Sequence, residues 1–301
     1  MPLPCLEALH REGVINGFEG TYKGKRAEFD EMIKAVEKAG GQLARANVDY
    51  AFHKTVRPYR STTVDIDTLV FGGKGEYDRA IQEMLGSGYE LVERGPRSTT
   101  IWDVECNIGV DLYEEIAVSY ITYLDKDTLT DHIVDLVLPN GRSVRHLDSA
   151  ADMAALIAHS VMKEQMYTLS EFYSYVHYLK SMSIDDFLQI LEKNCVTSAA
   201  KTHTSLNAMV YSIAYGKETH QMEKISDFLG TDVLEMNRLA KHDLQIPHKY
   251  HSLTVTRSLL ETAKRKKTRD SMAFQIYSMG NPSFTKKFLR ALLGHAVRGT
   301  Y

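Results

Sequence analysis

The stretch Val64-Asp65-Ile66-Asp67-Thr68-Leu69-Val70-Phe71 decides the expected fold of this chain. Its acidic and apolar residues alternate, and successive side chains of a β-strand point to opposite faces, so Asp65 and Asp67 are predicted to share one face. A glycine-rich turn at residues 72–75 follows, and apolar residues then recur with helical spacing over residues 77–85. The segment therefore predicts a strand, a turn and a helix, with two carboxylates side by side on the strand.

The flanking sequence indicates that this strand belongs to a mixed α/β domain. Apolar residues at spacings of three and four predict an amphipathic helix over residues 26–39, which Gly40 and Gly41 are expected to end. A short strand is expected at residues 48–52. Further strands are predicted at about residues 98–106, 108–113 and 116–123.

From about residue 148 the pattern changes from strands to helices. Ser149-x-x-Asp152, Thr168-x-x-Glu171 and Ser183-x-x-Asp186 each combine a hydroxyl at a helix N-cap with a carboxylate three residues later. We therefore expect two domains, an α/β (α+β) domain with a mixed sheet over residues 1–147 and a helical domain over residues 148–301.

Composition favours a soluble globular protein of a reducing compartment. The 301 residues are 44% apolar and carry a net charge of −3 at pH 7. No apolar run is long enough to span a membrane, and the N-terminus lacks the apolar stretch of a secretory signal. Three cysteines without a CxxC pair support neither a disulfide framework nor a cysteine zinc site. A cytoplasmic location is expected.

The aspartates of the decisive stretch, with a later acid, suggest metal-assisted chemistry. Carboxylates at positions i and i+2 of a strand can share a hard cation such as Mg²⁺ or Mn²⁺. A third carboxylate from a neighbouring strand would contact a second ion, and two such ions can bind a triphosphate and activate a hydroxyl. Asp111, Asp103 and Glu105 are the candidates for this third ligand. The pair of aspartates alone is a weak signal, because solvated carboxylates at such spacing are common.

The sequence before the aspartates resembles the nucleotidyltransferase superfamily of polymerase-beta-like enzymes. In that family a strand is followed by Gly and then Gly or Ser, nine to thirteen residues, an alternating carboxylate pair and a later third carboxylate. Here Thr55 falls on the second small residue, whereas Lys54 replaces the first glycine. The resemblance implies Asp65, Asp67 and Asp111 as metal-binding and catalytic residues and an NTP such as ATP as substrate. The loop after the first strand would bind phosphate through Lys54, Thr55, Arg57 and Arg60.

A second resemblance covers the start of the helical half. Archaeal nucleotidyltransferase-like proteins contain a segment similar to His159-Ser160-Val161-Met162-Lys163-Glu164-Gln165-Met166-Tyr167-Thr168-Leu169. A comparable lysine-bearing helix occurs in the nucleotidyltransferase toxins of abortive-infection systems. Asp152, His159 and Lys163 are spaced by seven and four, which predicts one shared helix face. The resemblance implies that Lys163 contacts the nucleotide and makes a toxin–antitoxin role one candidate. It covers roughly residues 25–195.

The C-terminal region is basic. Residues 241–301 contain twelve Lys and Arg against three Asp and Glu, a balance of +9. Basic residues over 264–298 alternate with aromatic ones, as in surfaces that bind an RNA backbone, although a solvated helix face explains the charge equally well.

Two functions follow from these patterns. The first is a metal-dependent nucleotidyltransferase that moves a nucleotide from an NTP to a hydroxyl of an RNA 3′ end, a protein or a small molecule. The second is a catalytically inactive relative that binds nucleotide or RNA, which the lysine in place of glycine would explain. The sequence leaves the base, the acceptor and the oligomeric state open.

Overall fold

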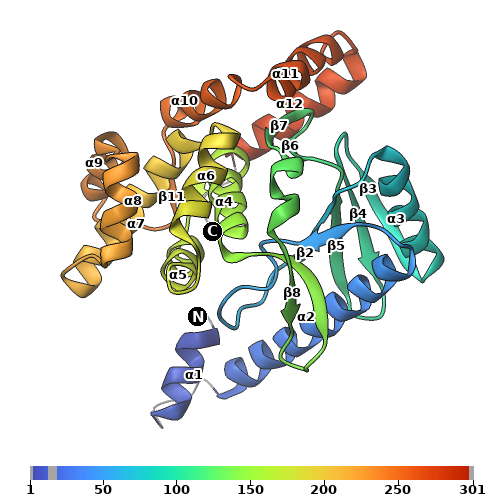
Figure 1. Cartoon of the computed structure of the whole chain (residues 1–301), viewed down its shortest axis with the longest axis horizontal. Helices are drawn as coiled ribbons and strands as arrows, with labels where there is room; N and C mark the ends of the chain where they lie inside the picture. The colour runs from blue at the N-terminus through green and yellow to red at the C-terminus, as the bar shows by residue number, and fades with distance from the viewer. Residues whose placement is uncertain (1–2, 13–18, 298–301) are drawn as a thin grey trace. The chain divides into compact units, whose positions relative to one another are not determined.

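The computed structural model describes residues 3–12 and 19–297. The chain divides into two compact units (Figure 1). The first comprises Met1–Glu115 and Thr130–Asp148, and the second comprises Ile116–Leu129 and Ser149–Tyr301. The expected α/β class, with a mixed sheet and a helical C-terminal region, is confirmed by these elements.

The first unit is built on a seven-stranded sheet with the order β3-β4-β5-β2-β1-β9-β8. Strand β2 runs parallel to β5, and β1 parallel to β9, whereas the other neighbours are antiparallel. The sheet is therefore mixed, as predicted. Its strands are β1 (Tyr50–Phe52), β2 (Asp65–Val70), β3 (Tyr89–Arg94), β4 (Ser98–Asp103), β5 (Ile108–Tyr113), β8 (Ile133–Val137) and β9 (Ser143–Leu147).

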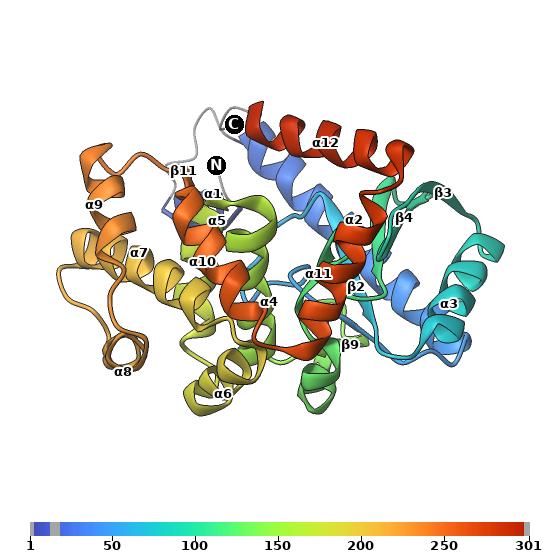
Figure 2. The ribbon, with the colours of Figure 1, turned by 90° about the horizontal axis from the view of Figure 1, so that it is seen from above.

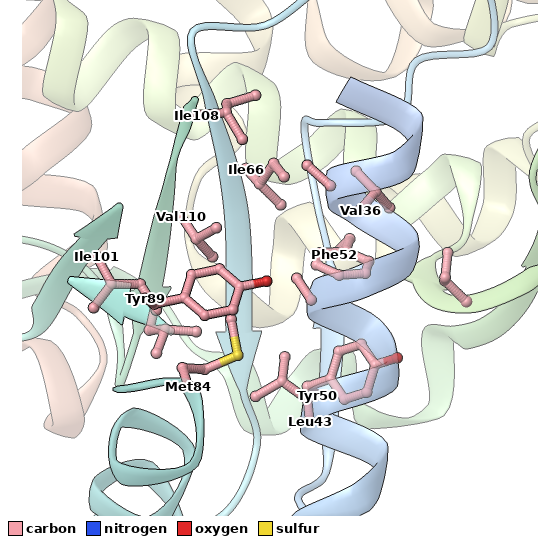
Figure 3. Packing of buried hydrophobic residues seen from close by; sticks show 14 of the residues in the cluster. Val36, Leu43, Tyr50, Phe52, Ile66, Met84, Tyr89, Ile101, Ile108 and Val110 are labelled. Carbon is pink, nitrogen blue, oxygen red and sulfur yellow. The ribbon is translucent and has the colours of Figure 1, made fainter. Parts of the chain in front are cut away.

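Helices α2 (Glu19–Arg45) and α3 (Lys74–Gly86) contribute the apolar residues that pack against the sheet. Ile66 of β2 and Val110 of β5 are register partners and both lie in this core (Figure 3). Alternation along each strand then turns the residues between them, Asp67 and Asp111, to the opposite face. The short helix α1 (Leu3–Arg11) adds Leu3 to the same core.

Gly40 does not end the first long helix, contrary to the sequence-based prediction. Helix α2 continues to Arg45, and Gly40 marks a close approach between the helix and β1. A Cβ atom at this position would lie 2.8 Å from the Tyr50 hydroxyl and 3.3 Å from the Phe52 ring. The Tyr50 hydroxyl also donates a hydrogen bond to the Gly40 carbonyl at 3.1 Å. The glycine therefore serves packing rather than termination.

The second unit is mainly helical. Two of the predicted N-caps are confirmed, because Thr168 and Glu171 form a capping box and the Ser183 hydroxyl accepts from the Asp186 amide. The helices are α4 (Ser149–His159), a π-helical turn (Ser160–Glu164), α5 (Leu169–Tyr178), α6 (Ile184–Asn194), α7 (Thr197–Tyr215), α8 (His220–Leu229), α9 (Val233–Lys241), α10 (Ser252–Thr262), α11 (Lys266–Ser278) and α12 (Pro282–Val297). Figure 2 shows α12 turning sharply away from the end of α11.

Residues 116–123, predicted as one strand, form a hairpin instead. Strands β6 (Ile116–Val118) and β7 (Ile121–Leu124) pair antiparallel around Ser119, which has a positive φ of 54°. The Thr122 amide donates to the hydroxyl of Ser271, and the Tyr120 amide donates to the side chain of Gln275. Both acceptors belong to α11, so the hairpin packs with the helical unit although it precedes residue 147. A 3₁₀ segment (Lys126–His132) follows it, and β10 (Met166–Tyr167) pairs with β11 (His248–Lys249).

Across residues 3–12 and 19–297, none of the helices combines the length and the apolar character that crossing a membrane requires.

Candidate active site on the sheet

Three of the predicted residues lie on adjacent parallel strands of the sheet. In the register of β2 and β5, Asp67 is directly opposite Asp111, and Asp65 is opposite Gly109. Since Ile66 and Val110 point into the helix-packed core, the aspartates project from the other face. The fold therefore brings residues that are more than forty positions apart in the sequence into neighbouring rows.

Gly109 leaves room beside Asp65. A Cβ atom built on Gly109 would have Asp65 Cβ at 3.7 Å and the Trp102 ring at 3.9 Å, both ordinary van der Waals distances. Trp102 of β4 is the register partner of Gly109 on its other side. The row through Asp65 thus consists of a carboxylate, a position without a side chain and a large aromatic ring.

Both carboxylate oxygens of Asp111 accept hydrogen bonds from neighbouring side chains. The Thr100 hydroxyl donates to Oδ1 at 2.5 Å, and the Tyr113 hydroxyl donates to Oδ2 at 3.3 Å. Thr100 is the register partner of Asp111 on β4, and Tyr113 follows it by two residues on the same strand face. These donors fix the orientation of the Asp111 carboxylate.

Lys54 places a cation beside one of the aspartates. Its Nζ lies 3.2 Å from Asp67 Oδ2, and the two side chains are 5% and 12% exposed. The same Nζ lies 5.6 Å from the centroid of the Tyr113 ring, a cation–π distance. Lys54 has a φ of +57°, in the left-handed region that glycine adopts more easily. The departure from the family pattern therefore keeps the backbone shape suited to glycine but adds an ammonium group beside Asp67.

Thr55 holds the loop against β2. Its hydroxyl accepts a hydrogen bond from the Asp67 amide at 2.9 Å and donates one to the His53 carbonyl at 3.1 Å, and the residue is fully buried. A second hydroxyl, that of Thr63, donates to the Asp65 carbonyl. Thr55 thus positions the backbone of the aspartate strand, a role that its place in the sequence motif did not reveal.

The other predicted phosphate ligands lie in different surroundings. Arg60 forms an ion pair with Glu7 of α1 at 2.9 Å, and Arg57 is half-buried in the same loop. Lys163 lies in the π-helical turn of the second unit. Their contact with a nucleotide stays a prediction.

The structure places Asp152, His159 and Lys163 in different surroundings. Asp152 is fully buried and accepts a hydrogen bond from the Tyr178 hydroxyl. His159 pairs with Glu164 at 3.1 Å across the π-helical turn. Lys163 lies in that π-helical turn, so the regular α-helical spacing that the sequence predicted for it is not kept.

The alternative third carboxylates contact a helix on the apolar-core side of the sheet. Asp103 is fully buried, and its Oδ1 accepts from Lys38 Nζ of α2 at 2.8 Å and from the amides of Glu105 and Cys106. Burial alone would raise the pKa of Asp103, but the bonds from Lys38 and the two amides outweigh it and lower that pKa. Glu105 is exposed and pairs with the same lysine at 2.8 Å. These contacts favour Asp111 over both.

No ready-made metal cage is present in the part of the chain that the structure describes, since no three His, Cys, Asp or Glu side chains group closely enough to hold an ion. This does not exclude a nucleotide-borne ion. Mg²⁺ is usually bound through one or two carboxylates together with substrate phosphates and water, rather than by protein ligands alone. Asp65 and Asp67 supply that number of carboxylates on one face of β2.

The basic C-terminal region is partly neutralised within the second unit. Arg265 and Lys267 pair with Asp125 at 2.9 Å and 2.6 Å, and Arg269 donates to the carbonyls of Ala263 and Lys264. These cations therefore hold α11 to neighbouring segments. Position 298, the end of the basic region, lies outside the described residues.

No protein-family model and no curated protein matches this chain. Among solved structures, it is similar to ANT(2″)-Ia in complex with adenylyl-2″-tobramycin, with 11% identity over 54% of this chain and 95% of the other, and a TM-score of 0.41. It is also similar to the lincosamide antibiotic adenylyltransferase LnuA bound to lincomycin, with 15% identity, coverage of 51% and 97%, and a TM-score of 0.34. A third similar structure is the STING-associated CdnE c-di-GMP synthase from Capnocytophaga granulosa, with 14% identity, coverage of 84% and 83%, and a TM-score of 0.33. Likeness at this level assigns no function, which has to be inferred from the side chains of the sheet.

Proposed function

We propose that this chain is a nucleotidyltransferase that uses Mg²⁺ or Mn²⁺ to move a nucleotide from an NTP to a hydroxyl acceptor. The observation that supports the proposal is the register of β2 and β5, which sets Asp67 opposite Asp111 on the face that also carries Asp65. Neither Asp67 nor Asp111 belongs to the apolar core of the sheet, on whose side Asp103 bonds to Lys38 of α2.

In the proposed reaction the acceptor oxygen bonds to the α-phosphorus of the NTP, and the bond to the bridging oxygen breaks to release pyrophosphate. Asp65 and Asp67 would hold a divalent ion, which would neutralise charge on the triphosphate. Asp111, oriented by Thr100 and Tyr113, takes the proton of the acceptor hydroxyl. Lys54 and Arg57 add positive charge on the loop that precedes β2.

The test is transfer of label from each α-³²P-labelled NTP, with Mg²⁺ or Mn²⁺, to total RNA, to protein or to small hydroxyl compounds. Wild-type protein should label one acceptor class, and Asp65→Asn and Asp67→Asn should abolish the labelling. Glu105→Gln is the matched control, because Glu105 is an exposed carboxylate outside the proposed site. Wild-type protein that shows no metal-dependent NTP binding by calorimetry would contradict the proposal.

One observation supports a second function, a nucleotide- or RNA-binding protein without turnover. The ammonium group of Lys54 neutralises a carboxylate that the reaction needs. In that case RNA binding would depend steeply on salt, would survive both aspartate substitutions and would occur without label transfer. A toxin role is a special case of the transfer reaction and would be recognised by labelling of a cellular RNA or protein with growth arrest on expression.

A further inference from the structure

Lys54 is the one feature of the candidate site that the family resemblance does not explain. We infer that its ammonium group is a built-in cation that takes the place of one of two divalent ions, so that the site binds a single divalent ion with its nucleotide. This inference rests on the proposed function for the identity of the ligand, but its test counts bound ions and needs no turnover.

The first support is the position of the charge. Lys54 Nζ is 3.2 Å from Asp67 Oδ2, and Asp67 is the register partner of Asp111. The Tyr113 ring, whose hydroxyl donates to Asp111, faces the same Nζ at 5.6 Å. The ammonium group thus contacts Asp67, one member of the carboxylate pair, and Tyr113, which bonds to the other.

The second support is enclosure. The Lys54 side chain is 5% exposed and that of Asp67 is 12% exposed, so water screens their interaction only weakly. A divalent ion that coordinates Asp67 Oδ2 would either meet the repulsion of the ammonium group or displace it into an environment without its partner. Removing one member of a buried ion pair is costly because the other charge is left uncompensated. Lys54 therefore opposes a second ion.

The third support is the backbone. At a φ of +57° a lysine costs about 1–2 kcal/mol relative to glycine, so its contacts with Asp67 and Tyr113 have to offset this cost. The same geometry makes Lys54→Gly a well-behaved test, because glycine adopts this conformation without strain.

Asp65 remains as the anchor for the single ion. It lies on the same face as Asp67, and the absence of a side chain on Gly109 leaves space beside it. One or two carboxylates and the phosphate oxygens of the nucleotide are the ligand set that Mg²⁺ prefers.

The experiment is a Mn²⁺ titration followed by electron paramagnetic resonance, with a nonhydrolysable α,β-methylene NTP analogue and without it. With the analogue, wild-type protein should bind one Mn²⁺ per chain and Lys54→Gly should bind two. Without it, Lys54→Gly should bind Mn²⁺ at least about tenfold more tightly than wild type, since loss of a neighbouring like charge exceeds the ~1.4 kcal/mol that a factor of ten requires.

Lys38→Met is the matched control, because it removes the lysine of the other buried lysine–aspartate pair in the same sheet. It should leave the Mn²⁺ number and affinity as in wild type. Two Mn²⁺ ions in wild-type protein, or the same Mn²⁺ affinity in wild type and Lys54→Gly, would overturn the inference. Label transfer by a wild-type protein that binds two ions would contradict this inference but support the proposed function. One ion in wild type and two in Lys54→Gly, without label transfer by wild type, would support this inference but contradict the proposed function.

Discussion

The sheet of the first unit contains two lysine–aspartate pairs in different settings. On the core side, Lys38 of α2 donates to Asp103, which also accepts from two backbone amides and is fully buried. On the other face, Lys54 approaches Asp67 at the longer distance of 3.2 Å and from a backbone with positive φ. Asp103 closes a packing contact between a helix and a strand, whereas Asp67 is in a row with Asp65 and faces Asp111.

Under the proposed function, this difference separates a structural ion pair from a functional one. The bonds to Asp103 Oδ1 compensate a charge that the fold has buried, so their loss should affect folding. Asp67, by contrast, shares its strand face with Asp65 and its register row with Asp111, outside the apolar core. Such an arrangement is expected where a cationic ligand completes the site. The distinction would be refuted if Asp103→Asn mainly reduced activity and Asp67→Asn mainly reduced stability.

The largest effect is expected from Asp67→Asn. If Asp67 holds the ion that neutralises the triphosphate, its loss should reduce label transfer by about 10³-fold or more, comparable to the loss of a major electrostatic contact in other active sites. Single-turnover label transfer at saturating NTP measures the change. Asp103→Asn is the comparison, and it should keep transfer within about threefold per folded molecule. Equal losses in both variants would show that the two pairs do not differ in role.

The next effect concerns stability. Asp103→Asn leaves Lys38 with the exposed Glu105 as its only acidic partner and should lower the free energy of unfolding by about 2–3 kcal/mol. Urea unfolding followed by circular dichroism measures this change. Glu105→Gln, which removes the exposed partner of the same lysine, should cost less than about 1 kcal/mol. A larger loss in Glu105→Gln than in Asp103→Asn would contradict the structural role of the buried pair.

A smaller effect is expected at Thr100. Thr100→Val keeps the shape of the side chain but removes the hydroxyl that donates to Asp111 Oδ1. A hydrogen bond to a charged group contributes about 1.5 kcal/mol or more, so transfer should fall about tenfold. The KM for the NTP should stay near wild type, because Thr100 orients the acid that receives the proton rather than the phosphates. A change confined to KM would indicate that Asp111 acts in nucleotide binding instead.

The arrangement of these residues was only partly predictable from the sequence. Alternation in residues 64–71 predicts that Asp65 and Asp67 share one face, because successive side chains of a strand point to opposite faces. The pairing with Asp111 required a later acid on a strand, and the register of β2 with β5 supplies it. Alternation along a strand and the presence of a later acid are local features that can be recognised in the sequence itself.

The rest depended on contacts that no local pattern encodes. The left-handed backbone at Lys54 and its approach to Asp67 follow from how the loop returns to the sheet. Gly40 was predicted as a helix end because its contact with Tyr50 is invisible in the sequence. The π-helical turn after His159 also escaped prediction, and it removes the helical spacing on which the position of Lys163 was inferred.

The smallest effect concerns how the free energy of unfolding changes with pH in acid. It tests the physical cause of the lowered pKa of Asp103. The pKa of Asp103 is lowered from its ordinary value of 3.8, because the bonds from Lys38 and the amides outweigh the opposing effect of burial. A carboxyl group with a lowered pKa in the folded state stabilises the protein above its unfolded pKa, and that contribution is lost as the pH falls below about 3.8 through the folded value. The free energy of unfolding should therefore fall less steeply below pH 3.8 in Asp103→Asn than in wild type.

Lys38→Met should flatten the slope as well, since it removes the main group that lowers the pKa of Asp103. The pKa of Glu235 in the second unit is also lowered, to about 2, because bonds from His248 and Thr254 outweigh its burial. Glu235 contributes equally to the acid sensitivity of all three proteins. Urea unfolding at intervals from pH 5 to pH 2.5 measures these slopes. If Asp103→Asn kept the wild-type slope, groups other than Asp103 would cause the acid sensitivity of this unit.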